Sequence, residues 1–299
     1  MNKLLLKKYN IYHYEKNKFN IRIFGNKTIN FSKKFKYVGM DNHRENIIWS
    51  DKIKEFTNNK LKSKDIIPEE LYPKIYNLEE LNDFSDDIKF YVKPIEGSNG
   101  KNINILKKKE ILRNKVKFKD CFIQQYLVPK TINDRKYDIR IYYFIIKQKN
   151  IISSFMSLNG KIRLCYEKFI NGNHKSEIAN SSQLSENDNL NELQGSLLNL
   201  LPLEREQIYR VIKKLDYHLK KFLKNIKDDF VNLYGIDLIT DKDNKTWILE
   251  LNGNPNWQIK QDSQNLKEIK TNIFNEILKI LSNHFYNKNY HIENWEKLN

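Results

Sequence analysis

Residues 233–255 read LYGIDLITDKDNKTWILELNGNP, and this stretch decides the fold. Two apolar runs are separated by a polar turn at residues 243–245, a pattern that predicts a β-hairpin. Asp237 and Glu250 each emerge from an apolar run, and their separation, 250 − 237 = 13, places them on paired strands. Asn252 lies two residues beyond Glu250 and therefore points to the same face. Three oxygen-bearing side chains are expected to converge.

Two carboxylates and an amide oxygen on a rigid hairpin suit Mg²⁺, a hard cation that takes oxygen ligands and often completes its shell with water and phosphates. Without a cation the two carboxylates would repel each other in a partly desolvated setting. A glycosidase pair would leave the glycine loop upstream unexplained. We therefore predict Asp237, Glu250 and Asn252 as metal ligands.

A second informative region begins at residue 88. Residues 89–94 are expected to form a strand that enters the loop 96–100, with sequence EGSNG, and residues 103–106 form the next strand. A strand follows the glycines, and neither GxxxxGKS/T nor GxGxxG is present, so a Walker loop and a dinucleotide fingerprint are both disfavoured. Two further strands are predicted at 121–127 and 138–146.

Charged residues mark the start of the strand at 138–146. Lys136, Asp138 and Arg140 are spaced by two and share one face of an otherwise apolar strand. Burying three charges in a row lowers the stability of the fold unless they contact a ligand or each charge is paired. The sequence leaves both explanations open, a ligand site and a self-compensating row of salt bridges.

Apolar residues at three- and four-residue steps predict two amphipathic helices, at 203–226 and 266–285. A shorter capped helix is expected to begin near Asn77, and another helix at 51–58. Short strands punctuated by turns are expected in the first fifty residues.

The composition predicts a folded, basic protein. The 299 residues include 53 Lys and Arg against 37 Asp and Glu, and 39% are hydrophobic, which is too apolar for a disordered chain. The net charge of +16 indicates an anionic partner without saying which, although a codon bias toward Lys and Asn could produce it without functional meaning. Cys121 and Cys165 suggest neither a disulfide nor a zinc site. No membrane segment or signal peptide is apparent, so we expect a soluble, cytoplasmic protein.

Four motifs occur in an order that resembles the tubulin tyrosine ligase-like family of ATP-grasp ligases. They are KP at 93–94 with its glycine loop, IQQY at 123–126, KYDIR at 136–140, and YGID through ELNGNP at 234–255. The resemblance covers roughly residues 88–258. It implies an α+β ATP-grasp fold, with antiparallel sheets that sandwich ATP. The expected domains are a small N-terminal α/β domain at 1–60, a central subdomain at 61–130, and a larger C-terminal subdomain at 131–299.

The resemblance also implies roles for single residues. Lys93, Arg140 and Arg163 would act on the transferred phosphate as catalytic residues, the glycine loop would cover the phosphates, and the segment 124–127 would bind adenine. Asn180 matches the last residue of the family's HLTN segment. The implied nucleotide-binding residues are Lys93, Gly97, Ser98, Asn99, Gly100, Gln124, Gln125, Tyr126, Leu127, Lys136, Asp138, Asn180 and Asp237. The implied Mg²⁺ ligands are the three side chains predicted above.

The implied activity is ATP-dependent ligation. ATP would phosphorylate an acceptor carboxylate, and the amine of an amino acid, with glutamate favoured, would then attack the acyl phosphate. The expected acceptor is an acidic protein tail, tubulin-like or on the protein itself, and the chain is expected to act as a monomer without nucleic acid. Addition of tyrosine or glycine, ligation of a small molecule or peptide, and a catalytically silent nucleotide-binding module remain as alternatives.

Two positions depart from the family's pattern. Asn102 stands where the loop usually has another glycine, and Glu177 stands where HLTN has histidine. Asn102 is expected to stiffen or reshape the glycine loop, and Glu177 to change the handling of the amino-acid or acceptor substrate.

Overall fold

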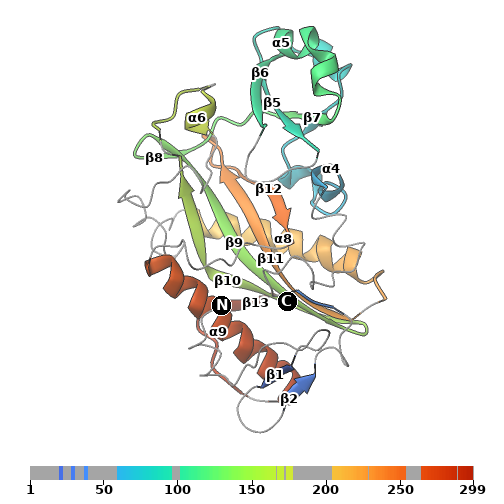
Figure 1. The fold of residues 1–299 in the computed structure, drawn as a ribbon, viewed down its shortest axis with the longest axis vertical. Coiled ribbons are helices and arrows are strands. Elements are labelled where there is room, and N and C mark those ends of the chain that lie inside the picture. The colour runs from blue at the N-terminus through green and yellow to red at the C-terminus, as the bar shows by residue number, and fades with distance from the viewer. Residues whose placement is uncertain are drawn as a thin grey trace.

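The structure is a computed structural model of the chain (Figure 1). It describes residues 20–22, 28–30, 37–39, 59–95, 102–165, 167–171, 173–177, 204–227, 229–253, 264–287 and 289–298. The helix predicted at 51–58 and the glycine loop at 96–100 lie outside these ranges. Among the first fifty residues the described part holds a small hairpin, β1 (Asn20–Arg22) with β2 (Thr28–Asn30), and the strand β3 (Tyr37–Gly39).

The larger of the two main sheets contains the hairpin that the sequence predicts. Its main strand order is β12-β11-β9-β10-β13, with β3 beside β11 and β8 beside β9. All of these pairs are antiparallel except β3 with β11. The strands are β8 (Thr131–Ile132), β9 (Arg135–Gln148), β10 (Ile151–Leu164), β11 (Phe230–Thr240), β12 (Thr246–Asn252) and β13 (Trp295–Leu298). The predicted strand at 138–146 is the central part of β9.

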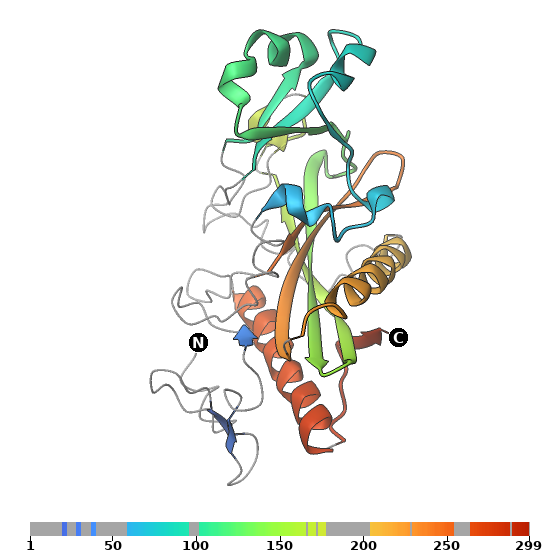
Figure 2. The ribbon, with the colours of Figure 1, turned by 90° about the vertical axis from the view of Figure 1, so that its right-hand side faces the viewer.

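The two predicted amphipathic helices cover opposite faces of this sheet, as the two views together show (Figures 1 and 2). The first is α8 (Arg205–Leu223), and the second is α9 (Gln264–Tyr286). The apolar stripe of α8 packs in one core cluster with the odd-numbered residues of β9, among them Ile139, Ile141 and Tyr143. Even-numbered residues of β9 project from the other face because side chains alternate along a strand. Asp138 and Arg140 therefore lie on the face opposite α8.

The smaller sheet has four antiparallel strands in the order β4-β7-β5-β6. It packs with short helices around a core of Leu81, Phe90, Val92, Ile111 and Ile123. Its elements are β4 (Ile75–Tyr76), η2 (Glu80–Asp83), β5 (Lys89–Pro94), β6 (Asn104–Lys107), α5 (Lys108–Arg113), η3 (Lys115–Phe118) and β7 (Cys121–Gln125).

The helix expected near Asn77 is a single 3-10 turn, η2, so that prediction was wrong in length. Asn77 does cap the turn, since its Oδ1 accepts hydrogen bonds from the backbone N–H groups of Glu79 and Glu80. The turn ends at Phe84, whose ring packs edge-on against those of Tyr76 and Phe90. Packing of this aromatic cluster, rather than helical periodicity, decides the local structure.

Short elements lie between the two sheets (Figure 1). They are α4 (Lys60–Ser63), η1 (Glu69–Leu71) and α6 (His174–Glu177). The first two contact β12, so the segment that leads into the smaller sheet runs past the predicted metal ligands. The smaller sheet falls inside the expected central subdomain at 61–130, but the boundaries of the three domains remain predictions. None of the described helices is long and apolar enough to cross a membrane.

Candidate active site

A row of charged residues crosses the larger sheet from strand to strand. Glu250 of β12 is directly opposite Asp237 of β11, which is in turn opposite Arg140 of β9. Arg140 is opposite Lys161 of β10, and two residues away Asp138 is opposite Arg163. Directly opposed residues project from the same face of a sheet. The register therefore brings charges from four strands onto the face opposite α8.

Two arginines hold Asp237. Arg140 donates from Nε and Nη2 to the two carboxylate oxygens, each at 2.7 Å, and Nη2 of Arg163 lies 3.1 Å from Oδ2. Nε of Arg163 also donates to Asp138. Burial alone would raise the pKa of Asp237, but the guanidinium groups of Arg140 and Arg163 lower it to about 2. Asp138 and Arg140 are thus paired within the protein, as the salt-bridge explanation of the row requires.

A β-bulge sets the position of Glu250. The register between β11 and β12 shifts after Asp237, so that Leu238 pairs with Ile248 and β12 carries one extra residue. Ile248 and Leu251 consequently both join the core cluster under α8, although they are three positions apart along β12. Glu250 stays beside Asp237 on the other face. Bulges often re-aim side chains in this way next to active sites.

The pKa of the Glu250 carboxylate is shifted in the opposite direction from that of Asp237. Burial and the neighbouring charge of Asp237 raise the pKa of Glu250. Within the part of the chain that the structure describes, Glu250 makes no hydrogen bond or ion pair. Asn252, two residues further along β12, is half-buried.

This donor set fits Mg²⁺, because a divalent cation would offset the repulsion between the two carboxylates and accept the amide oxygen as a third ligand. The described residues contain no group of three or more His, Cys, Asp or Glu that could hold a metal alone. Water and substrate phosphates would therefore complete the shell. The assignment of Asp237, Glu250 and Asn252 as ligands remains a prediction.

Two lysines from different sheets meet near these carboxylates. Nζ of Lys93, on β5, donates to Oε1 of Gln124 at 2.6 Å. Burial, the charge of Lys136 on β9 and that of Lys60 lower the pKa of Lys93 to about 7, while Glu250 acts in the opposite direction. Both Lys93 and Lys136 are predicted nucleotide-binding residues, and the structure brings them together.

Lys60 and Tyr72 belong to the site, and the sequence analysis missed both. Lys60 begins α4 and acts electrostatically on Lys93 and on Glu250. The hydroxyl of Tyr72 donates to the backbone carbonyl of Lys60 at 3.4 Å, and burial raises the pKa of Tyr72 to about 12. Neither residue lies in a motif. Only the course of the chain between the sheets places them here.

The predicted adenine segment borders the same space. Gln124 is fully buried, and its amide donates to the carbonyl of Pro73 at 3.2 Å while its oxygen holds Lys93. The backbone N–H of Gln125 donates to the carbonyl of Lys74 at 2.8 Å, so this group is already paired. Leu127 packs in an apolar cluster with Ile239 and Trp247. The role of these residues toward a base remains a prediction.

Five predicted residues, Gly97, Ser98, Asn99, Gly100 and Asn180, lie outside the described part of the chain. Asn102, which stands in place of a glycine, has φ of 60°. This left-handed region favours glycine and is tolerated by asparagine. Asn102 therefore keeps the backbone conformation that a glycine would allow.

A probable tubulin polyglutamylase of Caenorhabditis elegans, ttll-9, is 22% identical over 259 residues, which cover 77% of this chain and 60% of that protein. The chain thus spans about three fifths of that relative's length.

The profile of YheC/D-like ATP-grasp proteins matches residues 109–281. This match includes the charged row on β9 to β12, all of α8 and most of α9. It confirms the predicted ATP-grasp fold and agrees with the expectation of an ATP-dependent ligase. The chain belongs to the YheC/D-like ATP-grasp family.

Proposed function

We propose that the protein is an ATP-dependent ligase that joins the amine of an amino acid to a carboxylate of an acidic protein segment. One observation carries this proposal: Lys60, Lys93 and Lys136 come from three elements and interact electrostatically with one another or with Glu250, which lies opposite Asp237 and its two buried arginines. A polyphosphate needs such a ring of positive charge. Acyl transfer through a phosphorylated carboxylate needs no covalent enzyme intermediate, so no Ser, Cys or His nucleophile is required.

Each residue would have a role that follows from its position. Lys93 and Lys136 would bind the nucleotide phosphates, and Lys60 would add a third positive charge close to Lys93. Arg140 and Arg163 would stabilise the charge that builds on the transferring phosphoryl group, because their guanidinium groups are already oriented by Asp237. Orientation before the reaction lowers the cost of reorganisation in the transition state.

Asp237, Glu250 and Asn252 would hold Mg²⁺, which when bound neutralises phosphate charge and orients the nucleotide. Asp237 is ionised at neutral pH, and its oxygens would be shared between the cation and the two arginines that contact them. The raised pKa of Glu250 would fall when a cation replaces its repulsive contact with Asp237.

Glutamate is the favoured donor and an acidic segment the favoured acceptor. The net charge of +16 supports an acidic acceptor, since complementary charge raises the encounter rate. The name of the polyglutamylase relative supports glutamate. Because the chain covers 60% of that relative, its substrate is carried over here only as a proposal.

A labelling experiment tests the donor. The protein is incubated with Mg·ATP, a Glu-rich peptide and one isotope-labelled amino acid at a time, and Asp237→Asn serves as the inactive control. We expect glutamate to label the peptide or the enzyme. Labelling by tyrosine or glycine alone would overturn the donor. Turnover that responds only to a small metabolite would favour a small-molecule ligase, and ATP binding without any turnover would favour a silent nucleotide-binding module.

A further inference from the structure

Glu177 forms a buried polar cluster with two tyrosines of the smaller sheet. The residue is 0% exposed. The hydroxyl of Tyr91 on β5 donates to Oε2 of Glu177 at 3.1 Å, and the hydroxyl of Tyr126, just after β7, donates to Oε1 at 2.7 Å. The two rings also contact each other, with centroids 5.2 Å apart. A carboxylate can accept at both oxygens at once, whereas a neutral imidazole has a single acceptor nitrogen. The two tyrosines therefore match glutamate, and would not match histidine, at this position.

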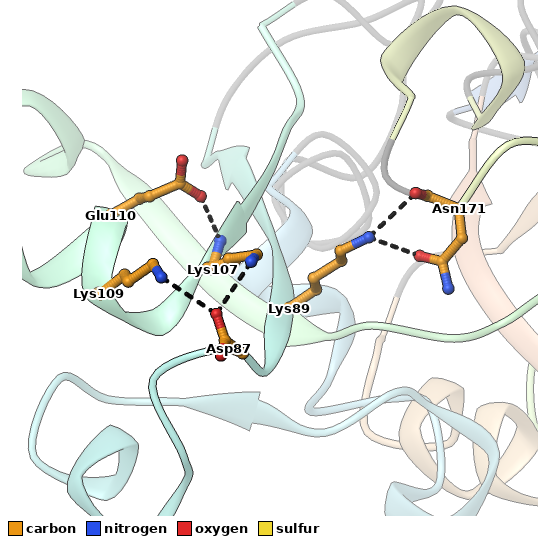
Figure 3. A network of polar contacts seen from close by, with 6 residues as sticks. All are labelled: Asp87, Lys89, Lys107, Lys109, Glu110 and Asn171. Carbon is orange, nitrogen blue, oxygen red and sulfur yellow. Dashed lines mark hydrogen bonds and ion pairs between the residues drawn. The ribbon is translucent and has the colours of Figure 1, made fainter.

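The segment that carries Glu177 is attached to both sheets. On the side of the larger sheet, Nζ of Lys136 donates to the backbone carbonyl of Glu177, and the N–H of Phe169 donates to the carbonyl of Asp134 at 2.6 Å. On the side of the smaller sheet, Nζ of Lys89 donates to the backbone and side-chain oxygens of Asn171 at 3.0 and 2.8 Å (Figure 3). Residues 167–171 and 173–177 thus bridge the two sheets.

The ring of Tyr91 is the point at which the two nucleotide lysines meet. Nζ of Lys93 lies 5.0 Å from the ring centroid, and Nζ of Lys136 lies 5.6 Å from it, both within the range of a cation–π interaction. Lys136 also approaches the Tyr91 hydroxyl, at 3.5 Å. Burial and the charge of Lys136 both lower the pKa of Lys93, so the two ammonium groups repel each other. The ring of Tyr91 thus contacts two like charges that come from different sheets.

We propose that Glu177 is a positioning residue for the nucleotide: it anchors Tyr91 and Tyr126, and Tyr91 in turn holds Lys93 and Lys136 at the spacing of the phosphates. Glu177 itself does not touch the reacting atoms. This inference rests on the proposed function, because it assumes that the two lysines bind ATP. It goes beyond that function by assigning a role to a residue outside the predicted site.

The test compares nucleotide binding in four variants. The dissociation constant for Mg²⁺ with a non-hydrolysable ATP analogue is measured by calorimetry for the full chain and for Glu177→Gln, Glu177→Ala, Tyr91→Phe and the Glu177→Ala/Tyr91→Phe double variant. Loss of one hydrogen bond to a charged group changes an equilibrium constant by more than tenfold. We expect Glu177→Ala to weaken binding by about tenfold and Glu177→Gln by less, since the amide retains one acceptor.

Glu204→Gln provides a matched control. Glu204 is also a buried glutamate that receives hydrogen bonds from a lysine and a tyrosine, Lys130 at 2.5 Å and Tyr137 at 3.4 Å, but it lies at the start of α8. Its loss should lower the melting temperature and leave the dissociation constant unchanged.

Binding and turnover together decide the inference. Non-additivity supports it: in the Glu177→Ala background, Tyr91→Phe should have almost no further effect on binding, because Glu177 acts through Tyr91. In turnover, the KM for ATP should rise while kcat stays within about twofold, since Arg140 and Arg163 are untouched. Unchanged analogue binding in folded Glu177→Ala, or fully additive effects, would overturn the positioning role alone. Absence of ATP binding by the unmodified chain would overturn the proposed function and this inference with it.

Discussion

The two carboxylates predicted to share one cation should respond oppositely when each is neutralised. Asp237→Asn removes the partner of two buried guanidinium groups, and removing one member of a buried pair costs about 3–5 kcal/mol of unfolding free energy. Glu250→Gln removes no hydrogen bond within the described residues and relieves a repulsion. Opposed residues on paired strands lie about 5 Å apart, so at an effective dielectric constant of about 20 the repulsion is about 3 kcal/mol before the arginines reduce it.

The assay measures stability and turnover on the same preparations. Urea unfolding in EDTA should show Asp237→Asn destabilised by about 3 kcal/mol or more, and Glu250→Gln at least as stable as the unmodified chain. ADP release in Mg·ATP should be lost in both variants, because each removes a charged ligand of the same cation. Glu110→Gln, on the exposed surface of α5, serves as the control for both readings.

Two results would refute this reasoning. A loss of about 2 kcal/mol or more in Glu250→Gln would mean that Glu250 makes a stabilising contact in the folded chain. Full ADP release by folded Glu250→Gln would mean that the cation is held elsewhere.

Three further predictions follow from the charges. Lys93 has a pKa of about 7, and bound phosphates favour its charged form, so ATP binding at pH 8 should take up close to one proton and should weaken as the pH rises above 7. Calorimetry in two buffers of different ionisation enthalpy measures the proton uptake, and zero uptake would contradict the prediction. Lys60→Ala removes a charge that lowers the pKa of Lys93, so the variant should bind ATP several-fold more weakly and should lose its ATP affinity at a higher pH than the unmodified chain. An unchanged pH profile of ATP binding would exclude Lys60 from the site. Modification of an acidic peptide should slow as salt rises from 0.05 to 0.3 M while ATP binding without peptide changes less; equal effects would argue against electrostatic steering of the acceptor.

The hairpin and its two carboxylates could be predicted from the sequence because their signals are local. Alternating apolar residues and a polar turn define β11 and β12, and the count of 13 residues places Asp237 and Glu250 on paired strands. The bulge, which this count does not predict, sets the two residues directly opposite each other. The same reasoning put Asp138 and Arg140 on one face of β9. The amphipathic stripes of α8 and α9 are equally local, and their ends fall within about three residues of the predicted ones.

The rest of the site depends on contacts that are distant in the sequence. Lys60 reaches Lys93 because α4 runs between the sheets, and no pattern around residue 60 indicates this. The bulge in β12 follows from the packing of both Ile248 and Leu251 in one core, which a two-residue alternation cannot describe. In the sequence, Glu177 is only a departure from a motif. Its contacts with Tyr91 and Tyr126, which precede it by 86 and 51 positions, are seen only in the structure.

Intact-mass spectrometry tests the central claim, ligation of an amino acid at the expense of ATP, most directly. The protein is incubated with Mg·ATP, all twenty amino acids and a set of acidic peptides, and ADP is measured in parallel. The account predicts a ladder of equal mass steps on a peptide or on the protein, one ADP per step, with a step size that identifies the donor. Neither a ladder nor ADP above the level of the Asp237→Asn variant would contradict it.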